Sequence, residues 1–91
     1  MKIKVFVLTH MYRTTNENET GLEVVAVLST MAKAKELFAE EKEKVAAEYE
    51  EEFPDDWEVY DNFPTLYGVN CKSEEIWDEL LITEKEVDNK E

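Results

Sequence analysis

The chain has 91 residues, of which 43% are hydrophobic and 36% are charged. This length suits one compact domain and excludes a second one, and the balance of apolar and charged residues excludes a disordered or membrane-spanning composition. Asp and Glu number 23 against 10 Lys and Arg, so the formal net charge is −13. Such an excess disfavours direct binding to nucleic acid or to anionic membranes. We expect a single domain over residues 1–88 and a frayed tail over residues 89–91.

Two features favour a cytoplasmic protein. Cys71 is the only cysteine, so no intrachain disulfide can form, and a reducing compartment is the natural setting. The apolar run over residues 5–8 is too short for a signal-peptide core, and no stretch reaches the ~18 apolar residues of a spanning helix.

The first predicted element is a β-hairpin. Residues 3–12 alternate between two faces, with Ile3, Val5, Val7, Thr9 and Met11 on one and Lys4, Phe6, Leu8, His10 and Tyr12 on the other. Both faces are largely apolar, which indicates a strand in the middle of a sheet. Residues 13–21 are polar and predict a loop. Residues 22–28 alternate again, with Leu22, Val24, Ala26 and Leu28 on one face, and predict the second strand.

A long helix is predicted next. Ser29 and Thr30 can cap a helix that starts at Met31, and residues 32–52 contain no Gly, Pro or Thr. Ala34, Leu37, Phe38, Val45, Tyr49 and Phe53 form one apolar stripe at helical spacing, interrupted by Glu41. Pro54 ends the helix. Its last turns are acidic where the helix dipole favours cations, so we expect this end to fray.

The remaining residues predict further strands. Residues 57–63 alternate, with Trp57, Val59 and Phe63 on one face. Residues 65–71 either continue this strand after a bend at Pro64 or form a short additional strand. Residues 73–75 could cap a turn of helix around Ile76 and Trp77, and the β-branched residues within 80–87 favour a final strand.

This order predicts an α+β fold in two layers, with one long amphipathic helix on a mainly antiparallel sheet of four to five strands, in ββαββ order. One helix covers only part of such a sheet. We therefore expect apolar residues such as Phe6, Leu8 and Tyr12, or their counterparts on other strands, on an uncovered face. Loops, the segment around Trp77 or a second subunit would shield them.

Several segments resemble a group of known proteins. Residues 4–12 (KVFVLTHMY), residues 24–35 (VVAVLSTMAKAK) and residues 82–88 (ITEKEVD) are similar to segments of short uncharacterised proteins of gut bacteria and their phages. Those proteins share the strand, strand, helix order. The resemblance covers about two thirds of the chain and is weakest over residues 63–73. It implies the fold and a phage or mobile-element setting, and it carries no catalytic or binding residue.

His10 and Cys71 are the natural candidates for catalysis. A histidine base needs an orienting carboxylate and a nucleophile within hydrogen-bond reach, and no hydrolase motif surrounds Cys71. We expect His10 to pack its ring and bond a backbone carbonyl, and Cys71 to be an inert buried thiol. The acidic residues lack the central Gly and closing Glu of a calcium loop. The sequence therefore predicts no enzyme, no cofactor and no metal site.

The most distinctive feature of the sequence is a run of acidic residues. Residues 45–71 contain no Lys or Arg, and eight acidic residues fall within fourteen positions: Glu48, Glu50, Glu51, Glu52, Asp55, Asp56, Glu58 and Asp61. Carboxylates spaced in this way can imitate the phosphates of nucleic acid and attract a basic, nucleic-acid-binding protein. The plain alternative is a solvated face that confers solubility.

Aromatic residues add a second element to the expected surface. Tyr60, Phe63, Tyr67 and Trp77 gather in the irregular part of the chain, and exposed aromatic groups with an acidic rim are typical of protein-binding surfaces. We predict a non-enzymatic protein-binding module, an antagonist that mimics nucleic-acid charge, with Tyr60, Tyr67, Trp77 and the eight acidic residues at the partner. The alternative is a homodimeric module that buries the uncovered sheet face.

Overall fold

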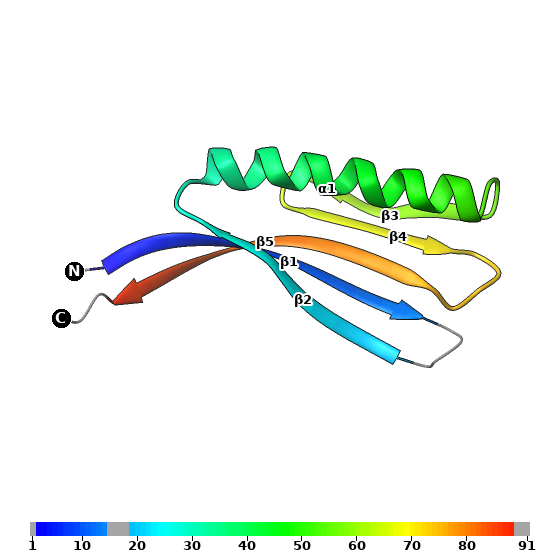
Figure 1. The fold of residues 1–91 in the computed structure, drawn as a ribbon, viewed down its shortest axis with the longest axis horizontal. Helices are drawn as coiled ribbons and strands as arrows, with labels where there is room; N and C mark the ends of the chain where they lie inside the picture. The colour runs from blue at the N-terminus through cyan, green and yellow to red at the C-terminus, as the bar shows by residue number, and fades with distance from the viewer. Residues whose placement is uncertain (1, 15–18, 89–91) are drawn as a thin grey trace.

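The computed structural model describes residues 2–14 and 19–88. Its elements are β1 (Lys2–Thr14), β2 (Glu19–Leu28), α1 (Met31–Glu52), β3 (Trp57–Phe63), β4 (Leu66–Cys71) and β5 (Trp77–Asp88). The fold is α+β as predicted, with one helix lying along one face of a five-stranded antiparallel sheet (Figure 1). The tail predicted over residues 89–91 lies outside the described residues.

The strand order in the sheet is β2-β1-β5-β4-β3. Strand β1 has a neighbour on each side, as its two apolar faces predict. The element order is ββαβββ where four or five strands were expected, because Pro64 and Thr65 form a turn and Phe63 pairs with Leu66 across it. Residues 66–71 are therefore a separate strand. The predicted helical turn around Ile76 is wrong, since residues 72–75 are a bend and β5 begins at Trp77.

The first hairpin is longer than predicted. The loop expected over residues 13–21 gives way to strand at both ends, with Tyr12 paired to Gly21 and Arg13 to Thr20. A Cβ on Gly21 would lie 2.3 Å from the Tyr12 ring. Gly21 thus leaves space for the close approach of the cross-strand tyrosine ring.

A β-bulge in β2 changes which residues share a face. Leu8 pairs with Ala26 and Thr9 with Val24, so Val25 is the extra residue. Leu22 and Val24 consequently lie on the sheet face away from α1, whereas Ala26 lies on the helix side. Simple alternation over residues 22–28 predicted that Leu22, Val24, Ala26 and Leu28 share one face. This prediction is wrong, because the bulge places Leu22 and Val24 on the other face from Ala26 and Leu28.

A second bulge has the same effect in β3. Val59 pairs with Val69 and Asp61 with Gly68, so Tyr60 is the extra residue. Trp57 and Val59 are on the helix side, and Phe63 moves to the opposite face, where 58% of it is exposed. The predicted grouping of Phe63 with Trp57 and Val59 is therefore wrong.

Helix α1 begins and ends close to its predicted limits. The Thr30 Oγ1 accepts a hydrogen bond from the Lys33 amide at 3.2 Å. Residues Ala34, Phe38, Val45 and Tyr49 are buried, and Glu41 lies at the margin of the buried stripe. The helix stays regular through Glu52 instead of fraying, with the Phe53 amide bonded to the Tyr49 carbonyl at 2.8 Å.

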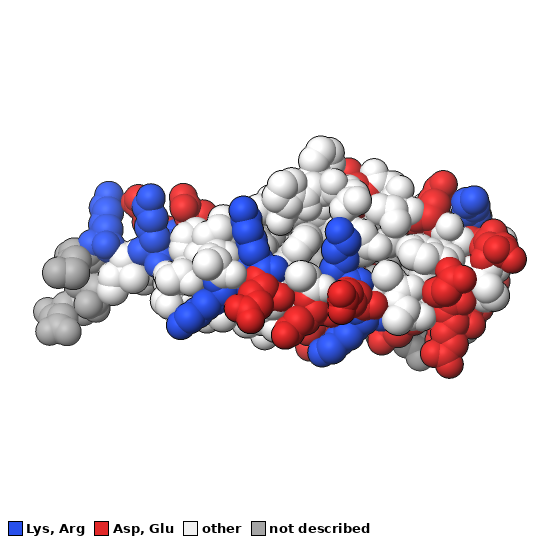
Figure 2. Space-filling model, turned by 90° about the horizontal axis from the view of Figure 1, so that it is seen from above, with Lys and Arg blue, Asp and Glu red and all other residues white. Residues whose placement is uncertain are grey.

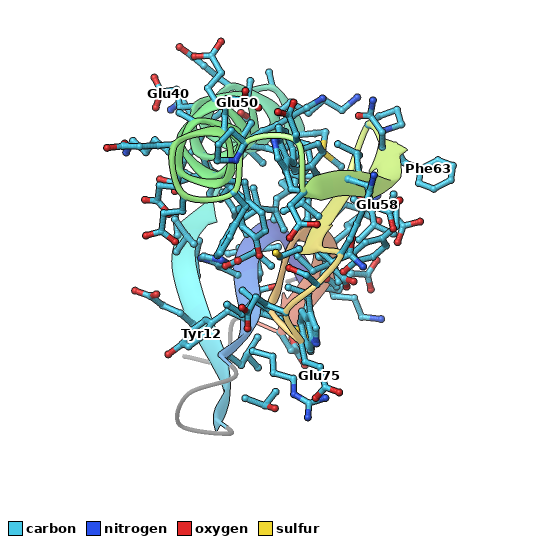
Figure 3. All side chains as sticks on the ribbon, turned by 90° about the vertical axis from the view of Figure 1, so that its right-hand side faces the viewer. Tyr12, Glu40, Glu50, Glu58, Phe63 and Glu75 are labelled. Atoms are coloured by element: carbon cyan, nitrogen blue, oxygen red, sulfur yellow. The ribbon has the colours of Figure 1, made fainter. Side chains whose placement is uncertain are left out.

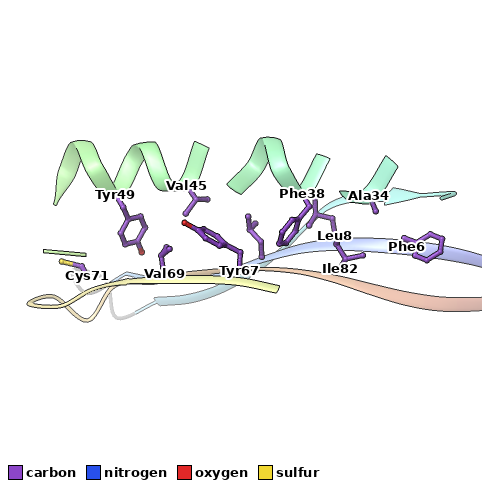
Figure 4. Packing of buried hydrophobic residues seen from close by; sticks show 11 residues of the cluster. Phe6, Leu8, Ala34, Phe38, Val45, Tyr49, Tyr67, Val69, Cys71 and Ile82 are labelled. Atoms are coloured by element: carbon purple, nitrogen blue, oxygen red, sulfur yellow. The ribbon is translucent and has the colours of Figure 1, made fainter. Parts of the chain in front are cut away.

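The core lies between α1 and the sheet (Figure 4). Leu8, Val69 and Leu80, from three adjacent strands, have no exposed surface. Phe6 and Leu8 were expected on an uncovered face, but the helix covers their side of β1, where Tyr12 also lies. The residues whose side chains point to the other face of the sheet are the uncovered ones. We call the sheet face opposite α1 the open face; its apolar residues are Ile3, Val5, Val7, Met11, Leu22, Val24, Val27, Phe63, Leu66, Leu81 and Val87.

Two leucine substitutions test this assignment. Leu80→Ala should lower the free energy of unfolding by about 2–5 kcal/mol, because it removes a fully buried side chain and leaves a cavity. Leu22→Ala, on a side chain that is 66% exposed, should change it by less than about 0.5 kcal/mol. Urea denaturation followed by circular dichroism measures both. Equal losses would contradict the placement of the core.

Candidate functional site

The acidic residues predicted to bind a partner lie at one end of the molecule. Glu48, Glu50, Glu51 and Glu52 belong to the last turns of α1, Asp55 and Asp56 to the α1–β3 turn, and Glu58 and Asp61 to β3. All are exposed except Asp56 and Asp61, which are half-buried. The structure adds Glu74 and Glu75 from the β4–β5 turn. We call these carboxylates together the acidic end (Figures 2 and 3).

Asp56 ties the two acidic turns together. Its Oδ2 accepts hydrogen bonds from the Ser73 hydroxyl and from the Cys71 thiol, the latter at 3.4 Å. Its backbone carbonyl accepts from the Lys72 amide at 2.7 Å. The bond from Ser73, followed by that from Cys71, lowers the pKa of the Asp56 carboxyl. The α1–β3 turn is thereby joined to the β4–β5 turn, although 15 or more residues separate them in sequence.

Local contacts shape the rest of this end. Asp55 has a φ of 71°, a left-handed conformation that Asp tolerates better than most residues and that reverses the chain after Pro54. The Trp57 indole donates to Glu50 Oε2 at 2.7 Å, which fixes the first residue of β3 against α1. Arg13 lies 3.5 Å from Glu75 and brings a positive charge to the edge of the acidic end.

His10 and Tyr49 share one carboxylate. His10 Nε2 lies 2.6 Å from Asp78 Oδ1, and the Tyr49 hydroxyl donates to Asp78 Oδ2 at 2.6 Å. The ring of His10 also meets Tyr12 edge-on at 5.7 Å between centroids. The expectation that His10 bonds a backbone carbonyl is therefore wrong in its partner. Asp78 was missed because the final strand was expected to begin at residue 80.

The His10, Asp78 and Tyr49 network joins β1, β5 and α1. It pairs an imidazole with a carboxylate, as a catalytic triad does, but the third group, the Tyr49 hydroxyl, bonds to Asp78 and not to the imidazole. Cys71, the thiol considered as a nucleophile, bonds to Asp56 and not to His10. The arrangement supports a structural polar bridge between the helix and the sheet.

The four predicted aromatic residues do not form one group. Tyr67 is 3% exposed and faces α1, with the Lys42 ammonium 4.9 Å from its ring centroid. Its inclusion in an exposed partner surface is wrong, because strand alternation turns it away from its neighbours on the open face. Phe63 projects into solvent at the end of β3 (Figure 3). Tyr60 and Trp77 line the same pocket.

This pocket, called here the aromatic pocket, opens on the open face. It has a volume of about 440 Å³ and is lined by Tyr60, Asn70, Trp77 and Glu79 from β3, β4 and β5. Sequence reasoning missed Asn70 and Glu79, since only the pairing of Asn70 with Trp77 and of Gly68 with Glu79 brings them beside the aromatic rings.

Within residues 2–14 and 19–88, no group of three or more His, Cys, Asp or Glu side chains is arranged to hold a metal ion. In the same residues, α1 lacks the long apolar stretch that a membrane crossing by a helix needs.

The pH dependence of the His10 contact can be measured directly. The hydrogen bond to Asp78 raises the pKa of His10 above 6.5 despite the opposing effect of burial. Stability from this contact is therefore fully present below pH 6.5 and is lost as the pH rises through the raised pKa. An NMR titration of this single imidazole should give a pKa above 6.5.

The variant Asp78→Asn provides the comparison, because it keeps an acceptor for Tyr49 and removes the negative charge. Its His10 pKa should fall below that of the unmodified chain, and the loss of stability as the pH rises above 6.5 should diminish. Asp61→Asn, outside this network, should leave the titration unchanged. A His10 pKa that is the same in all three proteins would contradict the contact.

Comparison with known proteins identifies no relative. No family model matches the chain, and no curated protein or solved structure shows significant similarity to it. The function is therefore inferred from the arrangement and chemistry of the side chains.

Proposed function

We propose that this chain is a small non-enzymatic protein-binding module that contacts a basic, nucleic-acid-binding protein through its acidic end. One observation carries the proposal. Carboxylates from α1, the α1–β3 turn, β3 and the β4–β5 turn come together at one end of the molecule, while residues 45–71 supply no Lys or Arg. Figure 2 shows acidic side chains gathered at this end with one basic side chain at its margin, whereas acidic and basic side chains are mixed along the middle of the molecule.

The backbone adds to this negative potential. The C-terminal end of a helix carries about half a negative charge, and the last turn of α1 holds no basic residue to offset it. The dipole therefore acts in the same direction as Glu48, Glu51 and Glu52. A concentrated field of one sign speeds the encounter with an oppositely charged protein.

The acidic end is also held in one arrangement. Asp56 joins its two turns through Ser73 and Cys71, and Glu50 is bonded to Trp57. Carboxylates that are ordered before binding lose less conformational entropy when a partner docks. A surface of this kind can occupy the groove that would hold phosphate groups. The module would then act as an antagonist of its partner, in the phage or mobile-element setting that its sequence resemblance implies.

A charge-reversal pair tests the proposal. The first variant changes Glu48, Glu51, Glu52 and Glu58 to Lys, which spares the hydrogen-bonded Glu50 and Asp56 and the left-handed Asp55. The control changes Glu36, Glu40, Glu43 and Glu84 to Lys, which alters the net charge equally with exposed residues outside the acidic end. Each tagged protein is used to capture partners from a bacterial lysate at low and at high salt, with and without double-stranded DNA as a competitor.

We expect the unmodified chain and the control to retain a nucleic-acid-binding protein that both salt and DNA release. The acid-end variant should retain at least about tenfold less of it, since several charge contacts are reversed. Retention that resists salt and DNA, or an equal loss in both variants, would contradict binding through the acidic end.

Self-association through the open face is a second candidate function. Leu22, Val24 and Val27 are 66%, 57% and 60% exposed there. The five strands contain 48 residues. At about 3.3 Å per residue and about 4.8 Å between strands, they give a face of roughly 800 Å². This area matches the roughly 800 Å² that each partner contributes to a standard interface. A second copy of the chain is therefore an occupant of suitable size.

Light scattering separates this candidate from the first. A homodimer should dissociate when Val24 and Val27 are changed to Lys, because two charges enter an apolar interface. Changing Lys33 and Lys35 to Glu, on the exposed side of α1, should leave its mass unchanged. A monomer at millimolar concentration would eliminate self-association and leave the acidic-end proposal standing.

A further inference from the structure

The aromatic pocket owes its shape to a glycine and a bulge. Tyr60 is the extra residue in β3, and its ring lies across Gly68 of β4. A Cβ on Gly68 would be 2.5 Å from that ring, so a larger residue at this position would displace the ring. The Tyr60 hydroxyl in turn donates to Glu79 Oε2 at 3.3 Å. One wall of the pocket thus combines an aromatic ring with a carboxylate.

The adjacent pair of residues along β4 and β5 offers a second ring and an unused acceptor. Asn70 pairs with Trp77 across β4 and β5, and both side chains line the pocket. The Asn70 Oδ1 is buried and accepts no hydrogen bond from any described residue. A buried acceptor without a donor is costly. Because the terminal torsion of Asn is broad, a small rotation can present this oxygen to a donor bound in the pocket.

The lining selects for a planar cation. Glu79 and Asn70 supply acceptors, Tyr60 and Trp77 supply aromatic faces, and no Lys or Arg is among the lining residues. A guanidinium group donates several hydrogen bonds in one plane and stacks on aromatic rings, which matches both features. The volume of about 440 Å³ falls within the usual range of small-ligand pockets.

The surrounding charge favours the same ligand. Two basic residues, Arg13 and Lys72, line the adjoining pocket, which shares Asn70 and Trp77 with the aromatic pocket. The Arg13 guanidinium lies 3.5 Å from the Glu75 carboxylate, which offsets its charge. The net charge of −13 adds a long-range attraction for cations. Burial and the charge of Glu79 raise the pKa of Tyr60 to about 12, so the phenol stays protonated and keeps its bond to Glu79 at neutral pH.

We propose that the aromatic pocket binds a guanidinium cation, held by Glu79 and Asn70 and stacked between Tyr60 and Trp77. The cation is either a small free guanidinium compound or the side chain of an arginine presented by another protein. This site goes beyond binding through the acidic end, because it lies on the open face and uses none of the eight acidic residues of the sequence run.

NMR titration with methylguanidinium chloride tests the site. We expect saturable shifts of the Trp77 indole N–H and of the Asn70 side-chain amide, and none of the Trp57 indole, which is bonded to Glu50. Urea, which is planar but uncharged, and methylammonium, which is charged but not planar, are run at the same concentrations. Both should bind at least about tenfold more weakly than methylguanidinium, since each lacks one of the two matched features.

A matched pair of variants separates the site from general electrostatics. Glu79→Gln removes the lining carboxylate, and Glu58→Gln removes a carboxylate that lies beside Asn70 on the same face but does not line the pocket. We expect Glu79→Gln to weaken binding at least about tenfold, because a charged hydrogen bond is lost, and Glu58→Gln to change it less than about twofold. Their amide spectra show whether both variants keep the fold.

A third titration distinguishes the two possible sources of the cation, a protein arginine and a free guanidinium compound. An acetylated Gly-Arg-Gly amide that binds more tightly than methylguanidinium assigns the site to an arginine of a protein, and equal affinities assign it to a free guanidinium compound. The proposal is overturned if methylguanidinium produces no saturable shift, if Trp57 shifts as much as Trp77, or if the two glutamine variants lose affinity equally. None of these readouts requires a protein partner bound at the acidic end, so this proposal and the acidic-end proposal can fail separately.

Discussion

The packing of one helix against the middle of the sheet is the contact on which the rest of the structure depends. Leu8, Val69 and Leu80 come from three adjacent strands and lie directly beneath the apolar stripe of α1. Because strand residues alternate between faces, burying these side chains fixes the register of β1, β4 and β5 at once. It also decides which set of residues remains on the open face.

The two bulges change which side chains of the sheet face the single covering helix. The extra residue Val25 turns Leu22 and Val24 outwards, and the extra residue Tyr60 turns Phe63 outwards. Each bulge adds apolar surface to the open face and so increases the exposed area of a small domain. The Tyr60 bulge has a second effect, since it lays an aromatic ring across Gly68 and creates one wall of the aromatic pocket.

Polar contacts connect the layers where apolar packing ends. Asp78 links His10 of β1 with Tyr49 of α1 at the margin of the core. Asp56 performs a similar role farther out, where it joins the two turns of the acidic end. The molecule therefore combines an ordered acidic surface with an apolar face. The first suits a basic partner, and the second suits either a further copy of the chain or a ligand of the aromatic pocket.

The sequence by itself determined the local features of this protein. The β1 alternation, the Thr30 cap and the stripe from Ala34 to Tyr49 predicted one helix on an antiparallel sheet, because helix and strand periodicities are set by neighbouring residues. The acidic run was equally evident, since net charge needs no coordinates. The separate strand over residues 66–71 was left open, because Pro64 is compatible with both a bend and a turn.

Tertiary structure decided which of these residues meet. The residue types around Val25 and Tyr60 do not reveal that a bulge occurs there. The faces occupied by Leu22 and Phe63 therefore could not be predicted from simple alternation. The partner of His10 and the acceptor for Ser73 depend on pairings between residues 68 and 17 positions apart. Asn70, Trp77 and Glu79 become one pocket only when β4 and β5 pair in register. Sequence patterns report the neighbours of a residue along the chain, whereas a site is made by its neighbours in space.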